Sequence, residues 1–301
     1  MVIKKALITV FVVCFIGMLT GCLKDDLLAC PEDYELHLKV VDLVSGADLT
    51  TSGEVEHVYL YIFDMDGRFI EYAPLSANDI RQRIPVTIKR SKSENIRIYA
   101  WGNLKDSQDV TEPVPGNLSE SMQIVLKTND EGYALCPDNL FFGEKVVSFS
   151  RQSRIQRAEI PVYHKNACMM ITVRGLEEIS DASQYYFKVD KKYNGYDFTG
   201  KPLESPVSIK QAGKINNTND DFVTADAFNL IHHMDGDEGV TISLYNQTTG
   251  KAVFTIDRTA DGESIVPRSG RMTNVLIDLR SQATVHIETT AWDEVYHWEI
   301  W

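Results

Sequence analysis

The sequence predicts a mostly β protein, with two tandem antiparallel β-sandwich domains after a lipoprotein signal peptide. Short runs with period-2 alternation, separated by Gly, Pro, Asn and Asp, dominate from Tyr34 onward. No window of 12 residues has sustained helical spacing of apolar residues, and only Ser76 to Arg81 is expected to form a turn or two of helix. An apolar run near the N-terminus ends at a cysteine.

The first 21 residues have the order of a secretory signal. Lys4 and Lys5 form the charged region, and the 14 residues from Ala6 to Leu19 form the apolar one. A membrane-spanning helix needs about 20 apolar residues, so a short anchor with an incidental cysteine is the weaker alternative. The sequence Leu19-Thr20-Gly21-Cys22 predicts cleavage between Gly21 and Cys22, with acyl chains such as palmitate on Cys22.

Residues 22–30 are expected to form a lipidated tether. Leu23-Lys24-Asp25-Asp26 resembles the tag that sends lipoproteins of the Bacteroidota to the cell surface, and it equally fits a solvated linker. The expected location is the outer membrane, lipid-anchored and exposed at the surface. The covalent lipid on Cys22 is the only prosthetic group expected.

Size and charge limit what the mature chain does. Removing residues 1–21 from 301 leaves 280, enough for two domains, which we predict at 31–157 and 158–301. The boundary follows the polar, Arg-rich stretch from Ser148 to Arg157. Loss of Lys4 and Lys5 takes the net charge from −13 to −15. An acidic surface disfavours nucleic acid, whose phosphates require clustered Lys and Arg.

Three cysteines remain after the signal and the lipidated residue are set aside: Cys30, Cys136 and Cys168. Cys30 and Cys136 each precede a proline, and an exported protein favours disulfides, so we predict a Cys30 to Cys136 bridge with Cys168 buried in its strand. Three unpaired thiols are the alternative.

Two sets of strands are expected. The first comprises 34–43, 55–63, 68–72, 83–89, 95–101, 121–127 and 140–149. The second comprises 159–174, 183–190, 205–210, 240–246, 252–257, 271–279, 284–290 and 293–300. The end of the strand 55–63 is apolar on both faces, which predicts a central strand covered on two sides.

Asp64-Met65-Asp66-Gly67 after an apolar strand resembles an aspartyl phosphatase motif, in which Asp64 would be the nucleophile and Asp66 the acid and base. Such enzymes alternate strands and helices, but here a second strand follows at once. Asp-Gly between two strands predicts a hairpin turn. The same string lacks the later ligands of a calcium loop.

No other catalytic or metal motif stands out, and we predict no enzyme activity, metal or small-molecule substrate. The acidic loop from Asp235 to Gly239 favours a solvated turn over a weak cation site. His232 and His233 are adjacent on an extended segment, so their side chains point to opposite sides and do not share an ion.

Aromatic residues gather near strand ends. An exposed row would stack on sugar rings, whereas burial in the sandwich cores is the commoner use. The residues concerned are Tyr99, Trp101, Phe141, Phe142, Tyr185, Tyr186, Tyr193, Tyr196, Trp292, Trp298 and Trp301.

Several strings together resemble the FimB-type fimbrial anchoring subunits of the Bacteroidales. They are the lipobox and acidic tether, Cys30-Pro31, the strand from Val58 to Phe69 with Phe63-Asp64-Met65-Asp66-Gly67, Trp101-Gly102-Asn103, Leu140-Phe141-Phe142-Gly143, Tyr196-Asp197-Phe198 and Trp292. The resemblance implies two transthyretin-like sandwiches and a non-enzymatic subunit that holds a fimbrium to the outer membrane and limits its length. A fimbrial shaft subunit is the implied partner.

Shaft subunits related to this family lose their first strand to an arginine-specific protease, and a neighbour's strand fills the groove. Here the loop from Ser45 to Glu54 has no Lys or Arg, and the first arginine after Cys22 is Arg68. The first strand is therefore expected to be retained, as suits a terminal subunit.

The last ten residues alternate and are rich in aromatics. They are expected either to form the last strand of the second sandwich or to be donated to the first shaft subunit through Trp292, Val295, Tyr296, Trp298 and Trp301. A surface glycan-binding lipoprotein of a polysaccharide-utilisation system is the alternative function, with aromatics as a sugar platform.

Overall fold

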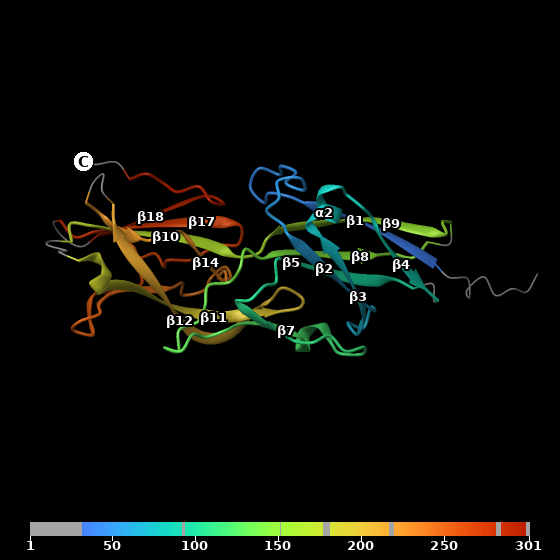
Figure 1. Cartoon of the computed structure of the whole chain (residues 1–301), viewed down its shortest axis with the longest axis horizontal. Helices are drawn as coiled ribbons and strands as arrows, with labels where there is room; N and C mark the ends of the chain where they lie inside the picture. Colours follow the sequence, from blue (N-terminus) through green and yellow to red (C-terminus); the bar gives the residue numbers. More distant parts are fainter. Residues whose placement is uncertain are drawn as a thin grey trace, which may run out of the picture.

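The computed structural model describes residues 32–91, 94–150, 152–176, 181–216, 220–280 and 284–298. Two halves lie end to end along the long axis of the molecule (Figure 1), and strands dominate both. Within these ranges the helices are the short α2 (Ala77–Arg81) and two 3-10 turns, η2 (Ser119–Ser121) and η3 (Ala182–Gln184). The prediction of a mostly β chain with one short helix after Ser76 is confirmed.

The first half is a seven-stranded sheet in the order β3-β2-β5-β8-β9-β1-β4. Its inner face encloses a core to which β1 and β2 both contribute, for example Leu36 and Leu60, each with no exposed surface. The strands are β1 (Glu32–Val40), β2 (His57–Phe63), β3 (Phe69–Ser76), β4 (Val86–Arg90), β5 (Ile96–Gly102), β8 (Phe141–Val147) and β9 (Ile155–His164).

The second half is an eleven-stranded sheet whose main path is β16-β15-β11-β12-β13-β10-β17-β18. It also takes in β14, which pairs with β10, and β6 and β7, which come from earlier in the chain. The strands are β6 (Gln108–Val110), β7 (Gln123–Leu126), β10 (Ala167–Arg174), β11 (Tyr185–Asp197), β12 (Pro202–Ile215), β13 (Phe222–Thr224), β14 (Phe228–Leu230), β15 (Thr241–Asn246), β16 (Lys251–Ile256), β17 (Arg271–Asp278) and β18 (Thr284–Ala291).

The pairing is mostly antiparallel, as predicted, with two parallel exceptions. β1 pairs in parallel with β9, and β10 pairs in parallel with β17. The predicted single strand 159–174 is wrong, because β9 ends at His164 and the chain crosses at Lys165 and Asn166 to the second sheet. The change of sheet therefore falls after His164 rather than at residue 157, since β9 completes the first sheet beside β1.

The turn between β2 and β3 confirms the hairpin interpretation. Gly67 has φ +78°, which glycine adopts without strain, and its N–H donates to the Asp64 carbonyl at 3.1 Å. The Asp64 carboxylate accepts the N–H groups of Asp66 and Arg68 at 3.0 and 2.8 Å. Asp64 therefore fixes a turn.

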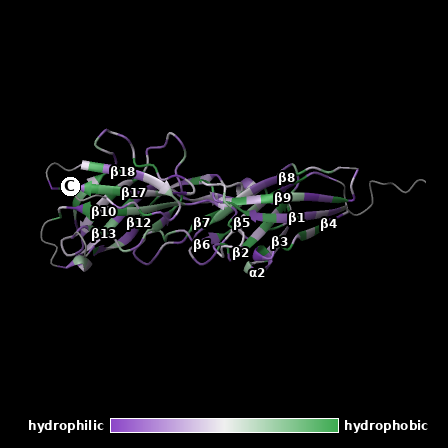
Figure 2. Ribbon diagram, turned by 90° about the horizontal axis from the view of Figure 1, so that it is seen from above, coloured by the Kyte–Doolittle hydropathy of each residue, from purple (hydrophilic) through white to green (hydrophobic). Residues whose placement is uncertain are grey.

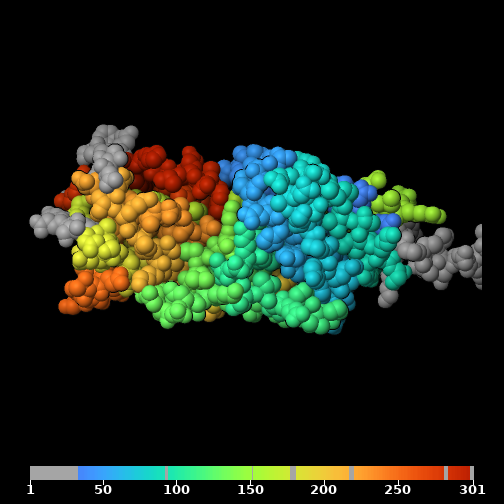
Figure 3. Space-filling view, in the orientation of Figure 1, coloured from blue at the N-terminus to red at the C-terminus, as the bar shows by residue number. Residues whose placement is uncertain are grey.

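A crossing segment of residues 103–140 joins the two halves. It leaves β5, runs along one side of the molecule in green (Figure 3), and brings β7 against β11 of the second sheet. Gly195 permits this contact, because a Cβ there would lie 2.1 Å from the Ile124 carbonyl oxygen. The segment also packs apolar side chains such as Met122 onto the outer face of β2 and β5.

The second core consequently extends into the first half. Tyr61 and Trp101 from the first sheet belong to the same buried cluster as Met169 and Phe187 from the second. β2 and β5 are thus covered on both faces, as predicted for the strand 55–63. Hydrophobic residues, green in Figure 2, recur along the strands of both halves, and hydrophilic residues are frequent in the connecting loops.

Candidate assembly site

β1 occupies an interior position of the first sheet, between β9 and β4. Its side chains alternate, with Tyr34, Leu36, Leu38 and Val40 buried in the core. Removal of this strand would strip both neighbours of a hydrogen-bonded partner and open an apolar groove. Retention or loss of β1 therefore decides whether this half presents an open groove to another chain.

The connection from β1 to β2, residues 41–56, contains no Lys or Arg and is tied down internally. The Val40 N–H donates to Thr50 Oγ1 at 3.0 Å. The Asp48 carboxylate accepts from the Thr50 N–H at 3.0 Å and pairs with Arg83 at 2.8 Å. Hydrogen bonds from Thr50, followed by Arg83, hold the pKa of Asp48 below its usual value. This loop is structured and lacks a cleavage site for an arginine- or lysine-specific protease.

His164, at the end of β9, lies where the loop, the two halves and the C-terminal segment meet. Its Nε2 lies 3.2 Å from Glu54 Oε2, and its Nδ1 lies 3.0 Å from Asn139 Oδ1. The ring stacks on Trp292 at 4.2 Å between centroids, with 18° between the planes. Burial lowers the pKa of His164 to about 4, so the neutral ring donates to one of its two acceptors.

The C-terminal segment, residues 292–298, does not continue the sheet. After β18 the chain turns at Trp292 and Asp293, so the predicted strand 293–300 is wrong over 294–298. The side chain of Asn274 in β17 hydrogen-bonds the backbone of this segment instead, since the Tyr296 N–H donates to Asn274 Oδ1 at 3.0 Å. A side chain thus replaces a neighbouring strand as hydrogen-bond partner.

The side chains of the C-terminal segment remain partly open to solvent. Val295 and Tyr296 are 39% and 40% exposed, and the Tyr296 ring lies edge-on to Trp298 at 4.8 Å. Trp301 lies outside the described residues. Of the five residues predicted to bind a partner, Trp292 is docked on His164 and the next three project from a segment without ladder pairing.

An aromatic cluster joins the two halves of the molecule. Trp101 is fully buried, and its Nε1 donates to the Phe198 carbonyl at 3.1 Å. The Tyr61 ring meets Phe198 edge-on at 4.7 Å, and Trp101 packs on Tyr196 at 5.5 Å. The candidate aromatics Tyr99, Phe141 and Tyr193 are also buried. Five of the eleven predicted aromatic residues are therefore buried, and Phe142 and Tyr185 pack partly buried against the same core, which disfavours a continuous exposed sugar platform.

The lipidation and cleavage residues Cys22 and Gly21, as well as Cys30, lie outside the described residues. Cys136 is a free thiol, and Gln211 Nε2 lies 2.9 Å from its sulfur. Cys136 is partly buried against the core of the second half. Because Cys30 lies outside the described residues, the Cys30 to Cys136 bridge stays a prediction. Cys168 is buried in β10, as predicted.

The remaining candidate sites are occupied by protein contacts. The His232 ring bonds the Tyr196 hydroxyl at 2.9 Å, while His233 lies against Tyr193, so the two histidines face different partners. Asp237 accepts from the Tyr193 hydroxyl at 2.8 Å. Among the described residues, no three His, Cys, Asp or Glu side chains group as metal ligands. The helices in the same ranges are all too short or too polar to cross a bilayer.

His164, Glu54 and Asn274 have no motif that marks them in the sequence. Each acquires its role from a partner that is distant in the chain: Glu54 and His164 are 110 residues apart, and Asn274 reaches Tyr296 across a strand and a turn. The sequence indicates the first strand and the C-terminal segment as parts of the site, but gives no signal for the residues that hold them in place.

Known proteins share this sequence and architecture. Major fimbrium anchoring subunit FimB of Porphyromonas gingivalis is 26% identical over 302 residues, covering 97% of this chain and 96% of the relative. The fimbrial anchor protein Mfa2 from the same species has a similar fold, with a TM-score of 0.66 at 16% identity over 87% of this chain and 98% of that one. A putative polysaccharide binding protein of Bacteroides thetaiotaomicron shares the fold at a TM-score of 0.68 and 14% identity, over 87% and 98% of the two chains.

Residues 27–298 match the family described as fimbrillin-A associated anchor proteins Mfa1 and Mfa2. The match spans the first sheet, the crossing segment and the second sheet, including the C-terminal segment up to Trp298. The chain therefore belongs to the fimbrillin-A associated anchor protein family.

Proposed function

We propose that this chain is a lipid-anchored outer-membrane subunit that holds the base of a fimbrium and limits its length. The observation that carries the proposal is that β1, inside the first sheet, is connected to β2 by a structured loop without Lys or Arg, which gives an arginine- or lysine-specific protease no target there. A shaft subunit that accepts a neighbour's strand must first lose its own. A subunit that keeps its first strand has no groove for a preceding subunit and suits the fixed end of the polymer.

Lipid at Cys22 supplies the attachment in this proposal. Nine residues separate Cys22 from the start of β1 at Glu32, so the folded body lies close to the lipid. Two or more acyl chains hold a protein far more firmly than one. The basal shaft subunit is the proposed partner, bound by strand addition, in which backbone hydrogen bonds provide affinity and side-chain pockets provide specificity.

A cleavage site introduced into the loop tests the role of β1. Thr51 is exposed, so Thr51→Arg places a target for an arginine-specific protease between β1 and β2. Thr51→Lys is the matched control, because it adds the same charge without the target. We expect the Thr51→Arg cells, exposed to such a protease, to shed fimbriae that the Thr51→Lys cells retain. Equal retention despite cleavage of the arginine variant would refute the proposal.

The C-terminal segment is the proposed donor to the shaft. Truncation after Asp293 removes the part held by Asn274 and leaves the Trp292–His164 stack in place. We expect the truncated chain to fold, measured by near-ultraviolet circular dichroism, and to lose fimbrial retention in electron micrographs. A folded truncation that still retains fimbriae would place the donor strand elsewhere. Deletion of the whole chain is expected to release long fimbriae into the medium.

A further inference from the structure

The end of the molecule from which β1 starts carries exposed cations that the proposed function leaves unexplained. β1 begins, β4 ends and β9 begins at the right-hand end in Figure 1. The strand register agrees, since Glu32 lies opposite Arg90 and Asp33 opposite Ile155. The polar, Arg-rich stretch at the predicted domain boundary joins β8 to β9 within the first sheet, so β8 and β9 form a hairpin whose turn lies at this end.

This hairpin is locally basic in an acidic protein. Residues 145–157 contain four Lys or Arg and no Asp or Glu, although the whole chain has a net charge of −13. Most acids nearby are already paired with arginines: Glu94 with Arg90 at 2.6 Å, Glu144 with Arg97 at 3.7 Å, and Glu35 with Arg157 at 3.3 Å. Among the acids of this group whose side chains the structure describes, Asp33, opposite Lys89, makes no ion pair.

Three further cations are exposed and make no ion pair within the described ranges: Lys89, Lys145 and Arg154. Val146 follows Lys145 in the chain and Ile155 follows Arg154, and each of these two apolar side chains is 38% exposed. We call these five residues the proximal tip. Cations around exposed apolar side chains match an anionic lipid surface, in which phosphates lie above the acyl chains.

The tether determines which surface the proximal tip meets. The ten residues after Cys22 span at most about 36 Å even when fully extended. The tip lies at the start of β1, so the lipid on Cys22 would hold it next to the bilayer at a high effective concentration. The acidic remainder of the chain does not prevent contact, because charges more than about 8 Å away are largely screened at physiological salt.

We propose that the proximal tip docks on the anionic lipid headgroups of the membrane that holds Cys22, so that the lipid and the tip together orient the long axis away from the bilayer. This inference rests on the proposed lipid anchor. A single flexible tether would let the body swing, whereas a second contact fixes its direction. A fimbrium under load would then pull along the molecule rather than peel it sideways.

Depth measurements on the acylated protein in vesicles test the docking. An environment-sensitive fluorophore is placed at Gln152→Cys, on the hairpin, and in a separate protein at Thr248→Cys, in the exposed turn of the second half. Quenching by nitroxide-labelled phospholipid is compared in phosphatidylglycerol–phosphatidylethanolamine and in phosphatidylcholine vesicles. We expect quenching at Gln152→Cys only, stronger with phosphatidylglycerol and weaker at high salt.

Charge-reversal variants test which cations of the proximal tip contact the lipid. Near an anionic surface each cation contributes about 1 kcal/mol, so each one removed should weaken tip contact about fivefold. Lys145→Glu with Arg154→Glu should therefore abolish quenching at Gln152→Cys, while Lys251→Glu on exposed β16 should leave it unchanged. Equal quenching at both labelled sites, or no effect of the double reversal, would overturn the docking. A chain that does not float with vesicles and lacks lipid by mass spectrometry would overturn the anchor itself and, with it, this inference.

Discussion

β1 and β10 each pair in parallel with a later strand, β9 and β17 respectively, but the side chains of β1 and β10 differ in solvent exposure. β1 alternates strictly between buried and partly exposed side chains. β10 is buried on both faces except at Met170. The C-terminal segment lies over Asn274 of the neighbouring β17, whose side chain is 1% exposed, and Asp221 pairs with Arg174 at the end of β10. The outer face at β1 is thus partly open to solvent, while the outer face at β10 and β17 is covered by other segments of the chain.

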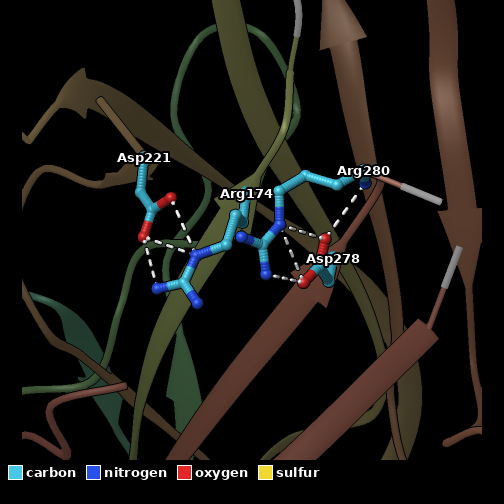
Figure 4. A network of polar contacts seen from close by, with 4 residues as sticks. All are labelled: Arg174, Asp221, Asp278 and Arg280. Atoms are coloured by element: carbon cyan, nitrogen blue, oxygen red, sulfur yellow. Dashed lines mark hydrogen bonds and ion pairs between the residues drawn. The ribbon is translucent and has the colours of Figure 1, made fainter. Parts of the chain in front are cut away.

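The ion pairs of the two halves also differ in how far they are exposed to solvent. In the second half, Arg174 and Asp221 are only 6% and 3% exposed and form a bidentate pair, with Asp278 and Arg280 paired next to them (Figure 4). In the first half, Arg83 and Asp48 pair at 2.8 Å with 49% and 36% exposure. Desolvated pairs depend strongly on both partners, whereas solvated pairs contribute little.

Breaking the buried pair should have the largest effect on stability. Asp221→Asn removes the bidentate carboxylate partner of the buried Arg174, and breaking a buried pair costs about 3–5 kcal/mol. We expect urea denaturation to show this loss, and the double variant Arg174→Met/Asp221→Leu to recover much of it. Asp48→Asn in the first half is the matched control, with a much smaller shift in the urea midpoint. Equal losses would show that burial does not distinguish the two pairs.

Trp101 tests how firmly the two halves share a core. Trp101→Phe removes the hydrogen bond to the Phe198 carbonyl and leaves that buried oxygen unpaired, at a cost of about 1–3 kcal/mol. Loss of ring volume adds to this cost. Differential scanning calorimetry should show a lower melting temperature and a single transition. Tyr72→Phe, at a side chain that is 50% exposed, should have little effect.

The folding stability of the second half should also depend on pH. Burial is the main cause that lowers the pKa of His233 to about 4, against about 6.5 in the unfolded chain. The unfolded state therefore binds the proton first, so this stability is complete above pH 6.5 and declines as the pH falls toward 4. The loss from His233 by pH 5 is about 2 kcal/mol.

His233→Phe should remove that part of the pH dependence. Neither ring nitrogen of His233 has a hydrogen-bond partner among the described residues, so the substitution loses no hydrogen bond. We expect unchanged or higher stability at pH 7.5 and a smaller difference between pH 7.5 and pH 5 in urea titrations. An unaltered pH difference would assign it to other groups.

The smallest expected effect on stability concerns the C-terminal segment, which lies over β17 of the second half. Asn274→Ala removes the side chain that holds residues 294–296, which should cost about 1 kcal/mol and open the segment to chymotrypsin at Tyr296 and Trp298. Thr273→Val is the control, because the buried Thr273 hydroxyl makes no hydrogen bond within the described residues. Faster cleavage of the control than of Asn274→Ala would contradict this role.

Local patterns were sufficient where neighbours in sequence are also neighbours in space. The turn at Asp64 to Gly67 depends on five consecutive residues, and both its type and the failure of the phosphatase interpretation follow from them. The short helix after Ser76 follows from its cap in the same way, since Ser76 and Asp79 bond each other's backbone N–H groups. Such features need no information from the rest of the chain.

Period 2 identified strands without identifying their partners. The run 159–174 has one continuous apolar pattern, yet the chain divides it between two sheets at Lys165 and Asn166. The final run alternates like a strand but lies over β17, because the Asn274 amide bonds its backbone in place of a neighbouring strand. β13 and β14 were missed because three residues are too few to show a period.

The sequence by itself determined the strand chemistry, the lipid-anchor signal and the absence of a protease target between β1 and β2, because each depends on residue types within a short stretch. Tertiary structure alone decided the two parallel pairs, the core shared by both halves, and the meeting of Glu54, His164 and Trp292. Those features join residues separated by about a hundred positions or more, and alternation along a strand contains no information about which distant strand will cover it.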